Sequence, residues 1–182
     1  MNVGQLSFYP VMEKLDLVPQ TVYNVISTVN WSCSKNDFYV AEINPSYAGG
    51  LDLCEKYKID PSMGANCLVV NGIRGKNKSF AACVVPVGYR YDMSGVVRKA
   101  LNARTVSVAP LDYVLSVSLM EYGSITPIGL PSDWRIFIDP AVLTHKNIVV
   151  GGGFVRSKMC IPSSALLDIP NSSVLEGLAK EV

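Results

Sequence analysis

The chain has 182 residues, of which 49% are hydrophobic and 17% are charged, and its formal net charge is +1. This length predicts one domain with a core that needs no disulfide or metal to hold it. The composition excludes a disordered chain, and the net charge excludes a polycation, so contact with RNA must be local or weak and transient. We expect a single domain over residues 1–182, with a helical N-terminal lead over residues 1–37.

Cysteine usage indicates a reducing compartment. The five cysteines show no C-x-x-C spacing, and their odd count is unlike a disulfide framework. The N-terminus lacks a basic segment followed by an apolar one, and no apolar run reaches the length of a membrane span. We therefore expect a cytoplasmic protein without a signal peptide or a membrane contact.

The first half of the chain alternates helical and strand patterns. Apolar residues at three-to-four spacing predict helices over residues 6–17 and 22–29, separated by Pro19. Residues 38–43 are typical of a strand, and a helix is expected over residues 49–57.

A central hairpin is predicted next. Two strongly apolar strands, residues 67–72 and 79–87, flank a basic turn over residues 74–78. Asp92 is a suitable N-cap for a following helix whose stripe runs to Leu101. These elements would place a two-stranded antiparallel unit at the centre of the fold.

The second half predicts one helix, three strands and a capping segment. The helix is expected over residues 111–119 and the strands over residues 134–139, 147–150 and 154–161. Residues 162–182 are expected to form short helices that cover the end of the domain.

A rigid apolar stretch lies between the predicted helix over residues 111–119 and the predicted strand over residues 134–139. Residues 123–131 hold two glycines and two prolines, which excludes a helix or a central strand. Ile125, Ile128 and Leu130 are too apolar for a solvated loop. The stretch is therefore either a buried structural corner or a pocket wall whose main chain faces a ligand.

A second glycine cluster follows an apolar strand. Gly151, Gly152 and Gly153 suit either a sharp bend or a place where a ligand touches the main chain. Arg156 and Lys158 lie at alternating positions, so on a strand they would share one face. They are either solvated charges or contacts for the phosphate or ribose of a ligand.

Motifs for metal or cofactor chemistry are missing from the sequence. His145 is the single histidine and lies in a polar turn with no carboxylate near it in sequence, so we expect it to be merely exposed. The cysteines lack ligand spacing, and no glycine-rich phosphate loop is present. We expect neither a metal nor a cofactor.

The stretch Glu121–Pro131 resembles the glycine-x-x-x-proline loop of the YbaK-like aminoacyl-tRNA editing family, with Gly123 to Pro127 matching the loop itself. This family includes free-standing deacylases and the insertion domain of bacterial prolyl-tRNA synthetases. The similarity runs from about Val40 to Gly177 and includes Asn66–Val70, Phe137–Asp139 and Gly151–Lys158. The resemblance implies an α/β (α+β) fold with a central mixed, largely antiparallel sheet flanked by helices.

The resemblance also implies a function. A trans-acting deacylase of this family would hydrolyse the ester between a mischarged small amino acid and its tRNA. Its partners would be the 3′ end of an aminoacyl-tRNA and an aminoacyl-tRNA synthetase, with no role for DNA. Arg156 and Lys158 would then contact the phosphate or ribose of the tRNA 3′ end. By resemblance, the aminoacyl group would be bound by Gly123, Ser124, Ile125, Thr126, Pro127, Gly129, Asp139, Gly151, Gly152 and Gly153. Asp139 would hold the amino group, although a carboxylate at a strand end is equally often a turn former.

Asn66 departs from the family pattern. The well-studied deacylases carry a lysine at the start of this strand, where Asn66 stands here. An amide carries no positive charge and stabilises a developing anion more weakly than a lysine. Asn66 and Lys158 are therefore the predicted catalytic residues, with Lys158 reaching in as the replacement. The alternatives are a non-catalytic module that binds aminoacyl-tRNA or an amino acid, and an unrelated small-molecule hydrolase. Cys67, next to Asn66, is expected to face the core.

Overall fold

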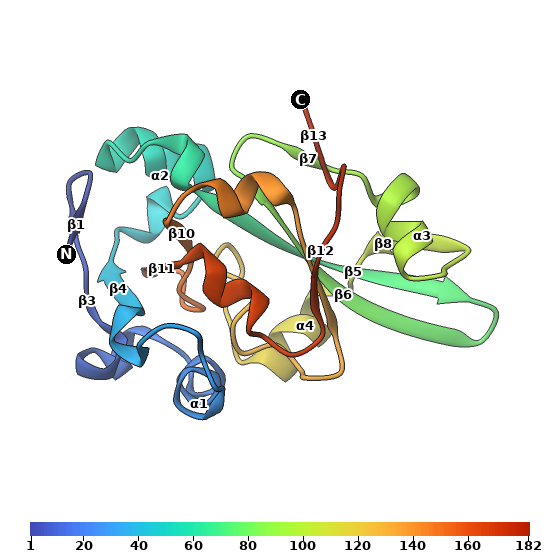
Figure 1. The fold of residues 1–182 in the computed structure, drawn as a ribbon, viewed down its shortest axis with the longest axis horizontal. Coiled ribbons are helices and arrows are strands. Elements are labelled where there is room, and N and C mark those ends of the chain that lie inside the picture. Colours follow the sequence, from blue (N-terminus) through green and yellow to red (C-terminus); the bar gives the residue numbers. More distant parts are fainter.

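Two β-sheets form the framework of the computed structural model, which describes residues 1–182 (Figure 1). The larger sheet contains, in spatial order, β12 (Ser172–Val174), β9 (Arg135–Ile138), β6 (Asn77–Pro86), β5 (Ala65–Arg74) and β8 (Thr105–Val108). The second sheet contains β10 (Asn147–Gly151), β11 (Ser157–Pro162), β4 (Tyr39–Glu42) and β3 (Tyr9–Pro10). Two short pairs are added by β1 (Asn2–Val3) with β2 (Leu6–Ser7), and by β7 (Arg90–Tyr91) with β13 (Ala179–Lys180).

Helices surround the two sheets. The α-helices are α1 (Gln20–Thr28), α2 (Gly50–Tyr57), α3 (Arg98–Ala100) and α4 (Leu111–Ser118). The 3-10 turns are Val11–Glu13, Leu15–Leu17, Lys35–Asp37, Pro45–Tyr47, Pro61–Met63, Pro140–Thr144 and Ser163–Leu167, and a π-helical turn, Met93–Val97, leads into α3. Within the sheets only β9 makes parallel pairs, with β6 and β12. The predicted α+β class with a mixed, largely antiparallel sheet is therefore confirmed. None of the helices has the length and hydropathy needed to cross a bilayer.

The predicted central hairpin is present as β5 and β6. Its strands pair without interruption from Ala65 opposite Pro86 to Arg74 opposite Asn77, and Gly75 in the turn has a φ of 61°. The apolar run of β6 is buried because β5 and β9 flank it and helical segments cover the sheet. The far end of this hairpin projects from the body of the molecule (Figure 1).

The two sheets meet near the start of β5. Gly64, just before β5, forms an isolated parallel bridge with Val149 of β10. The largest apolar cluster extends across this junction, with Val69 and Ala82 from the larger sheet, Val150 from the second sheet and Ile26 from α1. The cluster fixes the position of β5 relative to β10 and β11.

The N-terminal lead differs from the prediction. Residues 6–17 form short strands and 3-10 turns in place of a helix, whereas the predicted second helix is confirmed as α1. Gly4 has a φ of 56°, and Pro10 pairs with Tyr39 as part of β3, so the chain turns repeatedly along the second sheet. Pro19 caps the start of α1.

Two further elements were not predicted correctly. The C-terminal segment has one 3-10 turn, but its remainder supplies β12 and β13 in place of the expected short helices. Strand β8 was missed because it is only four residues long and lies between two helices. It forms one edge of the larger sheet beside β5, with Val108 opposite Val70.

Candidate active site

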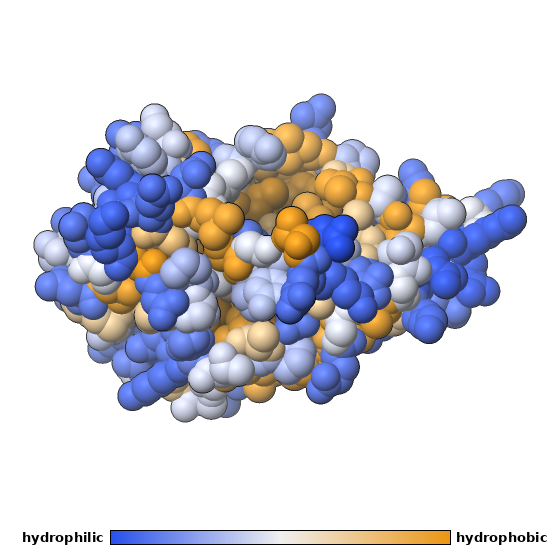
Figure 2. Space-filling view, turned by 90° about the horizontal axis from the view of Figure 1, so that it is seen from above, coloured by the Kyte–Doolittle hydropathy of each residue, from blue (hydrophilic) through white to orange (hydrophobic).

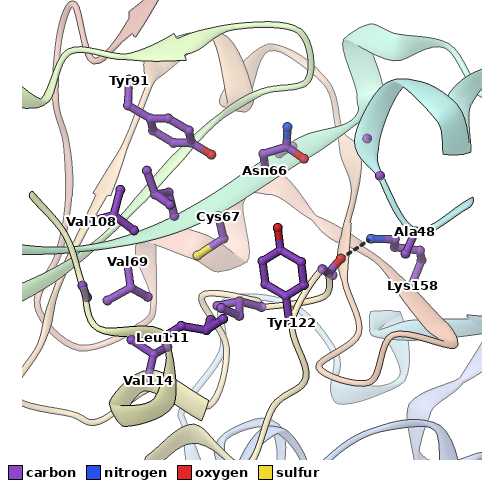
Figure 3. Close-up of a pocket in the computed structure, with 18 residues that line it drawn as sticks. Ala48, Asn66, Cys67, Val69, Tyr91, Val108, Leu111, Val114, Tyr122 and Lys158 are labelled. Carbon is purple, nitrogen blue, oxygen red and sulfur yellow. Dashed lines mark hydrogen bonds between the residues drawn. The ribbon is translucent and has the colours of Figure 1, made fainter. Parts of the chain in front are cut away.

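A cavity of about 390 Å³ lies beside the junction of the two sheets (Figure 3). Its wall combines the start of β5, the end of β8, the first turns of α2 and α4, the loop before β9, and one residue each from β10 and β11. Most of the lining side chains are apolar. In the space-filling view an apolar hollow opens near the middle of the molecule (Figure 2). A concave apolar site with a few polar groups is the usual form of a small-ligand site.

The loop before β9 packs directly against the triple glycine. Ser124 accepts hydrogen bonds from Gly152 N at its hydroxyl, 3.1 Å away, and from Gly153 N at its carbonyl, 2.9 Å away. Glu121 N in turn donates to Gly153 O at 2.7 Å. An added Cβ on Gly151 would lie 2.7 Å from Ile125 O, so only glycine allows this approach. The two glycine-rich segments therefore form one continuous piece of the wall.

Only part of the predicted loop faces the cavity. Gly123 and Ile125 line it, and neither backbone N–H donates to a protein acceptor. Gly123 has a φ of 87°, a conformation that favours glycine. These two N–H groups are thus not occupied by any acceptor of the protein.

The remaining predicted loop residues support the wall from behind. Ser124, Thr126, Pro127 and Gly129 are buried and do not line the cavity. Gly129 has a φ of 98°, and an added Cβ there would lie 2.8 Å from Val22 N, so the loop is pressed against α1. Gly152 and Gly153 likewise lie outside the lining.

Lys158 contributes the only cation of the cavity wall. It is on β11 opposite Gly151, and only 6% of the residue is exposed. Its Nζ donates to Gly123 O at 3.5 Å, and no carboxylate lies within 4.0 Å of it. Burial lowers the pKa of Lys158 to about 8, and the nearby Cys54 thiol opposes this effect weakly. A desolvated, unpaired ammonium beside a free main chain is typical of a functional site.

Asn66 lies across the cavity from the loop. It is half-buried on β5 and packs against the start of α2, since its Oδ1 would be 2.9 Å from a Cβ on Gly50. Gly49 and Gly50 also line the cavity, and Gly49 provides no side-chain cap for α2. The unsatisfied N–H groups of this first turn add a weak positive potential to the wall.

Among the cavity residues that the sequence did not predict, three carry a thiol or a phenol (Figure 3). Cys67 was expected in the core but is half-buried in the wall, and burial raises the pKa of its thiol far above the ordinary value. Tyr91 also lines the cavity, and burial raises the pKa of its phenol. Tyr122, which is 73% exposed, stands at the mouth. Its position directly before Gly123 was a usable signal, whereas nothing in the sequence singled out Tyr91.

Arg156 does not reach the cavity. Its guanidinium pairs with Glu42 at 3.2 Å and with Asp16 at 3.7 Å. Although β11 begins just after it, Arg156 precedes the regular strand, so the predicted shared face with Lys158 does not form. Its charge is already balanced by two carboxylates.

Asp139 also lies outside the cavity. One carboxylate oxygen accepts from Ala141 N at 2.9 Å and the other accepts from Ala179 N at 2.8 Å. The side chain thereby caps the turn after β9 and holds the C-terminal strand. The structure thus gives Asp139 the turn-forming position that the sequence left open.

No grouping of side chains is suited to a metal. Three or more His, Cys, Asp or Glu side chains do not come together at any point, and the cavity lining contains no carboxylate and no histidine. All five cysteines are free. The chemistry available in the cavity is therefore that of an amine, an amide, a thiol, two phenols and main-chain groups.

A sequence model of the aminoacyl-tRNA editing domain matches residues 47–169. The chain belongs to this family. The matched range contains the loop, the triple glycine, Asn66 and Lys158. The predicted resemblance is confirmed, while a search of curated proteins found no match.

Solved structures show the same fold. A candidate trans-editing enzyme for prolyl-tRNA synthetase superposes with a TM-score of 0.71 at 16% identity, covering 91% of this chain and 99% of the other. The hypothetical protein APE2540 gives a TM-score of 0.71 at 15% identity over 88% of this chain and all of the other. A candidate signal transduction protein from Marinobacter aquaeolei VT8 gives 0.54 at 12% identity, covering 87% of this chain and 30% of the other.

Proposed function

We propose that the protein is a trans-acting aminoacyl-tRNA deacylase that hydrolyses the ester between a mischarged small amino acid and the 3′ ribose of tRNA. The observation that carries the proposal is the buried, unpaired Lys158 in an apolar cavity against the Gly123 carbonyl. Membership of the aminoacyl-tRNA editing family supports the substrate class. The structural likeness to a candidate trans-editing enzyme for prolyl-tRNA synthetase is consistent with it, and a synthetase is a further proposed partner.

The cavity would hold the aminoacyl group with its ester carbonyl toward the loop. The N–H groups of Gly123 and Ile125 are unsatisfied and would donate to the oxyanion that forms in the transition state. A pKa of about 8 leaves the Lys158 amine mostly protonated at pH 7, so it would add a positive charge beside that oxyanion. One such donor contributes about 2.7–4 kcal/mol in enzymes that stabilise an oxyanion.

Water is the proposed nucleophile. Cys67 is the only thiol in the wall, and its raised pKa keeps it protonated and unreactive at neutral pH. The water oxygen would bond to the ester carbon, the bond from that carbon to the ribose oxygen would break, and the ribose oxygen would leave as a hydroxyl. The neighbouring ribose hydroxyl would accept a proton from the attacking water and pass its own proton to the leaving ribose oxygen, because no carboxylate or histidine lines the cavity.

The α-amino group would be held by neutral acceptors. The wall offers the Gly123 carbonyl, the Asn66 side-chain oxygen and the hydroxyl of Tyr91. An ammonium near Lys158 would be repelled, so we expect the substrate to bind with a neutral amine. Asp139 has no part in this step, since both of its carboxylate oxygens accept backbone hydrogen bonds elsewhere.

Asn66 favours one alternative function. If the lysine expected at this position is required for chemistry, the protein would be a binding module that retains the cavity and hydrolyses nothing. Asn66 lies 2.9 Å from the Cβ position of Gly50, so a longer side chain would have to extend toward the open cavity. The two functions therefore differ in whether Lys158 can replace the lysine that is missing at position 66.

A panel of mischarged tRNAs separates the two. Hydrolysis is measured with the wild-type protein and with Lys158→Met, Asn66→Lys and Lys146→Met, where Lys146 is an exposed lysine outside the cavity. Turnover by the wild type and by Lys146→Met, but not by Lys158→Met, supports the deacylase. Activity that appears only in Asn66→Lys supports the binding module. If neither the wild type nor any variant hydrolyses a mischarged tRNA, and none retains tRNA, both the deacylase and the binding module are refuted.

A further inference from the structure

Seven of the sixteen lysines and arginines gather at the end of the molecule that carries the β5–β6 turn. We call this region the basic end. Its members are Arg74, Lys76, Lys78, Arg98, Lys99, Arg104 and Arg135. In the space-filling view hydrophilic residues cover the projecting end at the right (Figure 2).

Hydrogen bonds hold several of these residues around one short segment. Arg74 Nε donates to Asn102 O, and Arg135 Nη1 donates to Ala100 O at 2.8 Å. Arg98 Nε donates to Ser94 O at 2.9 Å within the same segment. Guanidinium groups from β5, α3 and β9 are thereby fixed about the π-helical turn and α3, and the cluster is a feature of the fold.

The charge of the basic end is not compensated by ion pairs. The ion pairs of the protein involve Arg156 and Lys180 as the cations, and both residues lie outside this cluster. No carboxylate therefore lies within 4.0 Å of a charged nitrogen of the basic end. Uncompensated cations on an otherwise nearly neutral protein form a local surface that attracts a polyanion.

Strand β8 connects the basic end to the cavity. Arg104, just before β8, donates its N–H to Ile73 O beside the turn, while Val108 at the other end of β8 lines the cavity. β8 is an edge strand, and Thr105 and Ser107 are exposed on it. The neighbouring strand β5 also joins the two regions, from Asn66 in the cavity wall to Arg74 in the basic end. This distance is about 26 Å, at about 3.3 Å per residue.

We propose that the basic end and the exposed edge of β8 form the docking surface for the acceptor stem of the tRNA whose 3′ end enters the cavity. This inference rests on the proposed function. It assigns phosphate contacts to residues other than Arg156, whose charge is neutralised by Glu42 and Asp16. The hydroxyls and free main-chain groups of β8 suit ribose 2′-hydroxyls, which distinguish an RNA duplex from DNA.

The test compares two triple variants with the same change in charge. Lys76→Ala/Lys78→Ala/Arg104→Ala removes three cations of the basic end that make no side-chain hydrogen bond or ion pair. The control, Lys14→Ala/Lys35→Ala/Lys146→Ala, removes three exposed lysines outside the basic end. Hydrolysis is measured on a mischarged tRNA and on the corresponding aminoacyl-adenosine, which has the ester but no stem. Binding of an acceptor-stem RNA hairpin that carries no amino acid is measured by fluorescence anisotropy at several salt concentrations.

For the basic-end variant we expect hairpin affinity and tRNA kcat/KM to fall by roughly tenfold or more. We expect the slope of log affinity against log salt to become less steep by about 2–3, close to one phosphate contact per cation. Aminoacyl-adenosine should be hydrolysed at the wild-type rate, and the control should match the wild type throughout.

An unchanged salt slope, or an equal loss in the control, would overturn the assignment. So would a DNA duplex of the same sequence binding as tightly as the RNA hairpin. If the wild type hydrolyses neither ester, the proposed function fails. The binding comparison still decides whether the surface recognises an RNA stem.

Discussion

Replacing Lys158 with methionine is expected to make the protein more stable and less active. In the folded protein burial lowers the pKa of this amine from 10.5 to about 8. A tenfold change in a protonation equilibrium corresponds to about 1.4 kcal/mol, so keeping the charge buried at pH 7 costs the folded state about 3 kcal/mol. Methionine has a similar length, no charge and a flexible apolar chain that suits the cavity wall.

The pH dependence gives the effect a distinct signature. Below pH 8 both the folded and the unfolded chain hold the proton, so the full penalty is present and the contribution of Lys158 to stability does not change with pH. Between pH 8 and pH 10.5 the unfolded chain keeps a proton that the folded chain has released, so wild-type stability rises with pH. The stability gained by Lys158→Met should therefore shrink over this range.

Urea unfolding of the wild type, Lys158→Met and Lys146→Met at pH 7 and at pH 10 tests this directly. At pH 7 the first variant should gain about 3 kcal/mol, or about 6–12 °C in Tm for a chain of this size. Its kcat/KM on mischarged tRNA should fall by about 10²–10³, the loss of one oxyanion donor. A variant that is less stable than the wild type, or equally shifted at both pH values, would refute the idea that Lys158 is a desolvated cation.

Three further predictions follow from the cavity wall. Gly151→Ala should lower the free energy of unfolding by about 1–3 kcal/mol and abolish hydrolysis, because its Cβ would press on the loop carbonyls. The control is Gly49→Ala, whose Cβ meets only a flexible carboxylate at 3.3 Å. Equal urea midpoints for the two variants would contradict the prediction. Tyr122→Ala should raise the KM for tRNA by roughly 5- to 150-fold if its ring stacks on the terminal base, while Tyr122→Phe stays near the wild type; an unchanged KM in the alanine variant rules out stacking. After subtraction of spontaneous hydrolysis, kcat/KM should fall above pH 8 as Lys158 loses its proton, whereas a rise through pH 8 would make it a base.

The sequence was most informative where the chain is strongly patterned. Continuous apolar runs predicted β5 and β6, and the glycines and prolines of residues 123–131 predicted a rigid apolar stretch that was either a buried corner or a pocket wall. Both features are set by local preferences of the backbone. The prediction that this loop and the triple glycine bind the same aminoacyl group came from the family resemblance, since no local rule brings together segments that far apart in the chain.

The sequence was least informative where the role of a side chain depends on its distant partners. Arg156 and Lys158 are close in the chain, yet one is neutralised by acidic residues of the N-terminal half and the other is buried without a partner. Asp139 is held by a backbone N–H from the C-terminal strand, which was itself expected to be helical. The helical pattern of residues 6–17 was overridden because these residues pack along the second sheet.

The wall of the cavity divides into parts that mutation affects in different ways. Two of the oxyanion donors proposed here, the N–H groups of Gly123 and Ile125, belong to the main chain, which no side-chain substitution removes. The far wall is built from ordinary aliphatic side chains, such as Val69 and Val114. Trimming or enlarging one of these would alter the space for an acyl group by a methylene or two, worth about 1–3 kcal/mol of discrimination. Descendants of this chain can therefore exchange one rejected amino acid for another through single substitutions in the far wall, while the main-chain donors and Lys158 stay unchanged.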